Sequence, residues 1–184
     1  FDVGDGSSHP DLDVSAVLSN GGITKTGDGD MRLTGNNTIG FGINVNAGAL
    51  TLASGSAIGT STVTVNSNAL LAIDGTFTFI NGVLNLNSTA PVSLAIVSGD
   101  STWSSTVALT KNSTIDIPSG ASLDISSTIS GAGSLTKTGA GQLYLSGSTA
   151  DTYTSTTWVQ EGDLLLNNTG FNQTIVGPLI IGDG

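Results

Sequence analysis

Residues 131–166 read GAGSLTKTGAGQLYLSGSTADTYTSTTWVQEGDLLL, and this stretch predicts the fold. Apolar and polar side chains alternate in three runs within it, at residues 134–138, 142–146 and 157–166. Alternation with a period of two is typical of β-strands that bury one face. Glycines stand between or within the runs where the chain has to turn, at Gly139, Gly141, Gly147 and Gly162. The stretch therefore predicts short strands joined by tight corners.

The same pattern occurs earlier in the chain. Residues 23–35, ITKTGDGDMRLTG, align with residues 135–147, LTKTGAGQLYLSG, at an offset of 112 (135 − 23). Residues 46–52 align with residues 160–166 at an offset of 114 (160 − 46), so the later copy carries two extra residues. Units that cannot each close a core have to stack on one another, and stacking predicts a solenoid.

A shorter rhythm gives the size of one turn of this solenoid. Pairs of apolar residues separated by a Gly or Asn corner recur at a step of 20 residues, for example from Ile43 to Val63 and from Ile115 to Leu135. We therefore expect an all-β, right-handed parallel β-helix with roughly 20 residues per turn. Roughly nine turns spaced by about 4.8 Å would make a rod about 40 Å long.

Alternation also assigns side chains to the inside and the outside of the coil. We expect β-branched residues to point inward at Val45, Val65, Ile73, Ile117 and Ile125. The outward positions are expected at Thr64, Ala72, Asp116 and Asp124. Glycines at equivalent corners should have positive φ, at Gly48, Gly120 and Gly162. Asparagines recur at corners and are expected to hydrogen-bond to their counterparts one turn away, at Asn44, Asn46, Asn66, Asn68, Asn85 and Asn87.

Composition narrows the function classes. The 184 residues carry a net charge of −10 with only four Lys and Arg residues, so binding to nucleic acid phosphates is excluded. No run of 18 or more apolar residues occurs, so the chain is not expected to be membrane-embedded. Cysteine is absent, which removes disulfides and thiolate chemistry.

The quoted stretch resembles a known module, the autotransporter-associated β-strand repeat (passenger-associated transport repeat) of bacterial secreted surface proteins. The resemblance lies in residues 131–141, 143–147, 152–154, 157–159 and 161–164. It implies a β-helical passenger scaffold in the extracellular space or on the outer cell surface, without catalytic residues. We expect residues 1–184 to form one solenoid segment, with copies at about 19–52 and 131–166, cut from a longer repetitive chain.

The expected function is structural: a stalk, spacer or filament unit, with adhesion as an additional role. The alternative is a carbohydrate-binding adhesin surface that stacks sugars on Trp103, Tyr144, Tyr153 and Trp158. An enzyme ranks third. His9 is the only histidine, Arg32 the only arginine and Glu161 the only glutamate. The sequence therefore shows no motif that pairs a catalytic acid with a catalytic base. No catalytic residue is therefore assigned.

Neither a metal site nor a cofactor is assigned, but one calcium candidate stays open. Carboxylates cluster near the start of the chain, at Asp2, Asp5, Asp11 and Asp13. Carboxylate oxygens are ligands that calcium prefers, although the spacing matches neither an EF-hand nor the glycine-rich calcium repeats. The other interpretation is a solvated, Asp-rich turn.

The two ends of the sequence echo each other. Residues 1–6, FDVGDG, read again as residues 179–184, LIIGDG, at an offset of 178 (179 − 1). We expect the ends to belong to successive units of one rod, with an uncovered last turn. The predicted partners are neighbouring repeats or copies of the same chain placed end to end, with surface glycans as a further partner class.

Overall fold

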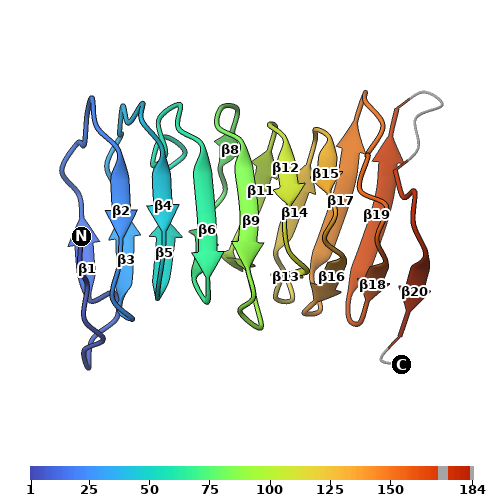
Figure 1. The fold of residues 1–184 in the computed structure, drawn as a ribbon, viewed down its shortest axis with the longest axis horizontal. Coiled ribbons are helices and arrows are strands. Elements are labelled where there is room, and N and C mark those ends of the chain that lie inside the picture. The colour runs from blue at the N-terminus through green and yellow to red at the C-terminus, as the bar shows by residue number, and fades with distance from the viewer. Residues whose placement is uncertain (170–173, 183–184) are drawn as a thin grey trace.

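The computed structural model describes residues 1–169 and 174–182, and it is a β-solenoid (Figure 1). Parallel strands stack into about eight turns of roughly 21 residues each, close to the nine turns of 20 residues that the sequence predicts. The turns follow one another along the long axis, from the N-terminus at one end to strand β20 at the other. Helices are absent from the described residues, so none there is long and apolar enough to span a membrane.

Three parallel sheets form the sides of the coil. The nine-stranded sheet contains, in spatial order, β1 (Leu12–Val14), β3 (Asp30–Leu33), β5 (Ala49–Leu52), β7 (Leu70–Asp74), β10 (Leu94–Ser98), β13 (Ser113–Asp116), β16 (Leu135–Thr138), β18 (Thr157–Val159) and β20 (Leu179–Ile181). The six-stranded sheet contains β2 (Ile23–Lys25), β4 (Ile43–Val45), β6 (Val63–Ser67), β9 (Leu84–Ser88), β12 (Val107–Leu109) and β15 (Ile129–Gly131). The five-stranded sheet contains β8 (Thr78–Phe79), β11 (Asp100–Trp103), β14 (Ser122–Ile125), β17 (Gln142–Gly147) and β19 (Asp163–Asn168).

The middle turns are three-sided. From β6 to β17 the chain visits the six-, nine- and five-stranded sheets in strict rotation. Residues 34–42, between β3 and β4, take the place of a strand of the five-stranded sheet. Residues 148–156, between β17 and β18, take the place of a strand of the six-stranded sheet. The two sequence copies therefore share a local path, but they run on different sheets of the coil.

The core is a set of apolar columns inside the coil, and the predicted inward positions are confirmed. Residues one turn apart are direct partners in the sheets, as in the pairs Val45↔Val65 and Leu123↔Leu143. The five side chains expected inside are at most 1% exposed, at Val45, Val65, Ile73, Ile117 and Ile125. Each fully buried aliphatic side chain of this kind contributes roughly 1.5–3 kcal/mol relative to an exposed one.

One outward assignment needs correction. Thr64, Asp116 and Asp124 are partly exposed, as expected, but Ala72 is only 4% exposed. Its methyl group lies between its partners in the neighbouring turns, Thr51 and Ala95. Strand β7 follows the expected alternation, but a side chain as small as that of Ala72 is covered by its neighbours even on the outer face.

The three predicted corner glycines have positive φ, which confirms that prediction: 62° at Gly48, 80° at Gly120 and 68° at Gly162. Their corners are not the same edge of the coil, however. Gly48 lies where the chain passes from the six- to the nine-stranded sheet, between β4 and β5. Gly120 and Gly162 lie where it passes from the nine- to the five-stranded sheet. The same local turn therefore serves two different edges.

An asparagine ladder follows the outside of the six-stranded sheet. The Asn66 side-chain amide donates to Asn46 Oδ1, and the Asn87 amide donates to Asn66 Oδ1, each at 3.1 Å. Two other predicted asparagines bond to threonines in adjacent turns instead, Asn85 to Thr64 at 3.4 Å and Asn68 to Thr89 at 3.2 Å. The expected bonding to counterparts is thus confirmed for Asn46, Asn66 and Asn87.

Candidate functional site

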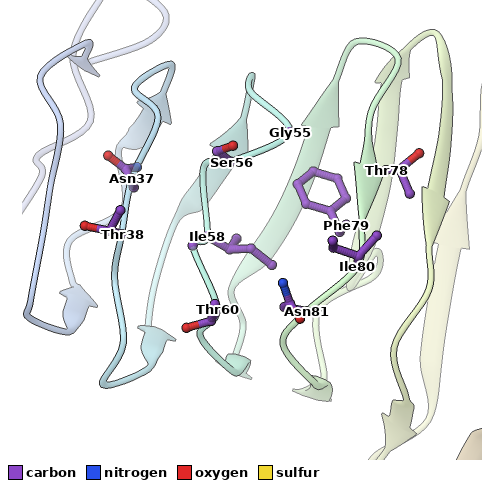
Figure 2. A pocket seen from close by; sticks show the side chains of 11 residues that line it. Asn37, Thr38, Gly55, Ser56, Ile58, Thr60, Thr78, Phe79, Ile80 and Asn81 are labelled. Atoms are coloured by element: carbon purple, nitrogen blue, oxygen red, sulfur yellow. The ribbon is translucent and has the colours of Figure 1, made fainter.

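A cleft opens in the side of the coil where the five-stranded sheet begins (Figure 2). Residues 55–60 of one turn form one wall, and residues 78–81 of the next turn form the other. The two turns approach closely at both ends of the opening. A Cβ added to Gly82 would overlap the Ser61 carbonyl oxygen, and one on Gly55 would lie 3.6 Å from Phe77. The result is a short, closed-ended cleft with a volume of about 520 Å³.

The lining is uncharged. Hydroxyls and amides lie around the mouth of the cleft, and the buried Ile58 and Phe79, each 1% exposed, lie behind them. Ile80 is 68% exposed and adds an apolar rim. The labelled side chains in Figure 2 are Asn37, Thr38, Ser56, Ile58, Thr60, Thr78, Phe79, Ile80 and Asn81, beside Gly55. This lining offers neutral donors and acceptors, and no general acid or base occurs among its described residues.

Strand β8 forms one wall with an unpaired edge. On its far side it pairs with β11, where Thr102 N–H donates to Phe77 O at 2.7 Å and Ser104 N–H to Phe79 O at 2.8 Å. In a parallel strand, alternate residues direct their backbone groups to opposite sides, so Thr78 directs its N–H and C=O toward the cleft. Across the described part of the chain, no backbone hydrogen bond joins residues 78–81 to residues 55–60.

Two buried lysines, which the sequence analysis counted only as charges, tie successive turns together. Lys25 and Lys137 are 0% exposed and occupy the same place in the two copies. The Lys25 ammonium donates to the carbonyls of Gly27 at 2.7 Å and Ala47 at 2.9 Å. The Lys137 ammonium donates to those of Gly139 at 2.6 Å and Glu161 at 3.3 Å. Desolvation lowers the pKa of both lysines. The repeated sequence Lys-Thr-Gly was the available signal.

A second matched pair lies in the loops that replace the third strand. Leu18 N–H donates to Asn37 Oδ1 at 2.9 Å, and Ile129 N–H donates to Asp151 Oδ1 at 2.6 Å. Asn37 is 3% exposed and Asp151 4%. Burial raises the pKa of Asp151 to about 6, against the lowering effect of the Ile129 hydrogen bond. The offset between the two residues is 114 (151 − 37), so the two extra residues of the later copy precede Asp151.

The structure does not assemble the four predicted sugar-stacking aromatics, which corrects that prediction. Trp103 and Tyr153 are 0% exposed and belong to the core, where Trp103 packs against Phe79 with ring centroids 5.1 Å apart. Tyr144 and Trp158 are partly exposed, but they lie in the five- and nine-stranded sheets respectively. Two buried rings and two rings on different sides of the coil cannot form one platform for a sugar.

The calcium candidate is also dispersed. Asp11 accepts hydrogen bonds from Gly6 N–H at 2.7 Å and Asp30 N–H at 2.8 Å, and these bonds lower its pKa. Asp13 lies 3.8 Å from Arg32 Nη1, and Asp2 accepts a bond from Thr26. The four aspartates, Asp5 included, do not come together as a metal site. In the described residues, no group of three or more His, Asp or Glu side chains could hold a metal ion.

The fold and its stacked copies define a class of protein, the β-solenoid repeat proteins. The family profile of the passenger-associated transport repeat matches two parts of the chain, residues 23–53 and 135–166, so the resemblance drawn from the sequence is confirmed. Both matches contain one of the buried lysines and the strands that follow it. Neither curated proteins nor solved structures provide a match to this chain.

Proposed function

We propose that this chain is a structural, rod-like spacer of a bacterial protein that is secreted or displayed on the cell surface. The observation that carries the proposal is the presence of two matched repeats within one uninterrupted coil, since strand pairing continues from β1 to β20 across both copies. Passenger repeats of this kind are typically structural, which supports a scaffolding role without catalysis. Adhesion would then be a property of particular surface sites on the rod.

The partners of this rod are neighbouring repeats or copies of the same chain, placed end to end. Strand β20 supports this part of the proposal because, among the residues that the structure describes, it pairs with β18 alone. Its three side chains are exposed, with Leu179 at 44%, Ile180 at 45% and Ile181 at 76%. An apolar strand with a free edge favours addition of a further strand. Residues 183–184, the rest of the predicted echo, lie outside the described residues.

Sedimentation velocity over a range of concentrations tests this proposal. The wild-type chain should associate as its concentration rises, and small-angle scattering should show particles that lengthen without widening. Ile181→Lys places a charge on the β20 edge and should abolish the association. Val97→Lys is the matched control. Val97 is 54% exposed, but it belongs to β10, a strand in the middle of the rod and not at its end. A wild-type chain that stays monomeric, or equal loss in both variants, would contradict end-to-end stacking.

A further inference from the structure

We propose that the cleft beside β8 binds a neutral monosaccharide or disaccharide that carries an N-acetyl group. This goes beyond the structural role, and it uses none of the four aromatic residues expected to stack sugars. The volume of about 520 Å³ lies within the range of small-ligand sites, roughly 300–1,000 Å³.

The shape of the cleft excludes an extended peptide. A peptide that added a strand to β8 would have to continue past both ends of this two-residue strand. At one end the Ser61 carbonyl contacts the Gly82 backbone too closely to admit even a Cβ, and at the other end the Phe77 side chain leaves room for little more than a Cβ on Gly55. The occupant must therefore fit between the two closed corners.

Charge and polarity select the class of ligand. The chain has a net charge of −10, yet the described lining of the cleft holds only hydroxyls, amides and apolar groups. Anionic ligands would be repelled by the overall charge, and cationic ligands would find no carboxylate in the lining. Neutral hydroxyls of a sugar can both donate to and accept from Ser56, Thr60 and Asn81.

The unpaired edge of β8 selects the N-acetyl group. Thr78 directs one backbone N–H and one C=O into the cleft, and an acetamido C=O can accept from this N–H. Because a secondary amide is trans, its own N–H points the opposite way, toward the hydroxyls of residues 55–60, and a sugar hydroxyl can donate to the Thr78 C=O. The acetamido methyl group would then contact the apolar rim at Ile80. A hexose without the acetamido group would leave the Thr78 N–H without the acetamido C=O as its acceptor. An amino sugar with a free amine lacks the same C=O.

Titration of the isotope-labelled 184-residue chain with N-acetylglucosamine, di-N-acetylchitobiose, glucose and glucosamine tests the proposal by amide chemical-shift changes. The two acetylated sugars should shift amides in residues 55–60 and 78–81, and glucose and glucosamine should bind at least tenfold more weakly. Absence of shifts at millimolar acetylated sugar, an equal response to glucose, or shifts located elsewhere would overturn it.

Two variants test whether the sugar binds in this cleft. Thr78→Pro removes the N–H that faces the cleft, a change that an edge strand tolerates because the bonds of Phe77 and Phe79 to β11 remain. Ser56→Trp fills the opening from the other wall. Each should weaken binding by roughly tenfold or more, while Thr64→Trp, on the outer face of the six-stranded sheet, should not. If Thr78→Pro does not fold, Ser56→Trp still decides, because unchanged affinity in that variant contradicts the assigned cleft. Solution association through β20 is independent of all these results.

Discussion

Replacing Asp151 by Asn should stabilise the chain at neutral pH. Asp151 is 4% exposed, and burial raises the pKa of its carboxyl group from 3.8 to about 6. At pH 7 the folded chain therefore holds a buried negative charge whose direct hydrogen-bond donor is the Ile129 N–H. Asparagine keeps an oxygen that can accept this bond and removes the charge.

The size and sign of the effect follow from linkage between protonation and folding. A rise in pKa from 3.8 to about 6 corresponds to about 3 kcal/mol at most. Since the folded-state pKa lies above the unfolded value, the protonated group favours folding below pH 3.8, and this contribution is lost as the pH rises through 6. Asp151→Asn and the wild type should differ least near pH 4, and the variant should be more stable by up to about 3 kcal/mol at pH 7.

Urea denaturation of the wild type and the variant between pH 4 and 8 measures this difference directly, because contributions of the other carboxylates cancel. The earlier copy supplies the reciprocal variant, Asn37→Asp, which introduces a carboxylate at the matched position and faces the Ala57 carbonyl. It should lose stability at pH 7 and regain part of it toward pH 4. A difference between wild type and Asp151→Asn that stays constant with pH, or reverses sign, would refute the reasoning.

Three further changes have expected results that urea denaturation can check. Lys137→Ala leaves three carbonyls without their donor and should lower the free energy of unfolding by roughly 3 kcal/mol. Lys111 is exposed, so Lys111→Ala should be neutral. Equal effects of the two substitutions would contradict the role of the buried ammonium. Gly120→Ala should cost about 1 kcal/mol for its φ of 80° alone, and Gly48→Ala clearly more, because its Cβ would also overlap the backbone one turn away; the opposite order would be inconsistent with these corners. Asn66→Ala removes two ladder bonds and should cost roughly 1 kcal/mol, and no loss would mean that water replaces them.

The parts of the fold that the sequence predicts are those with strong local patterns. Strict alternation places Val45 and Val65 inside because the pleat leaves no other register. Glycine at position 120 indicates a corner because other residues rarely adopt its φ of 80°. In DSTW, at residues 100–103, the pattern is ambiguous, since the inward partner of Trp103 is the polar Ser101. This ambiguity let Trp103 be assigned to a surface site.

The candidate cleft could not be predicted, because it depends on a pairing that is not made. Residues 55–60 read GSAIGT and residues 78–81 read TFIN, and short mixed segments of this kind can stack or separate without a change in local pattern. The buried lysines illustrate a different limit. Lysine is rarely buried, so composition alone gives no reason to place Lys25 and Lys137 inside the coil, and only their repeated place before Thr-Gly distinguishes them from Lys111.

The use of different sheets by the two copies has a consequence for anything carried on the rod. Their offset of 112 residues, at roughly 21 residues per turn, is about five and one third turns. The loops at 34–42 and 148–156 therefore face directions about 120° apart and are separated by about 25 Å along the axis, at 4.8 Å per turn. A longer rod that kept this interval would present its loops on a three-fold screw, returning to the first face after about 75 Å. Loops arranged in this way would meet partners from every side and would not crowd one another on a single face.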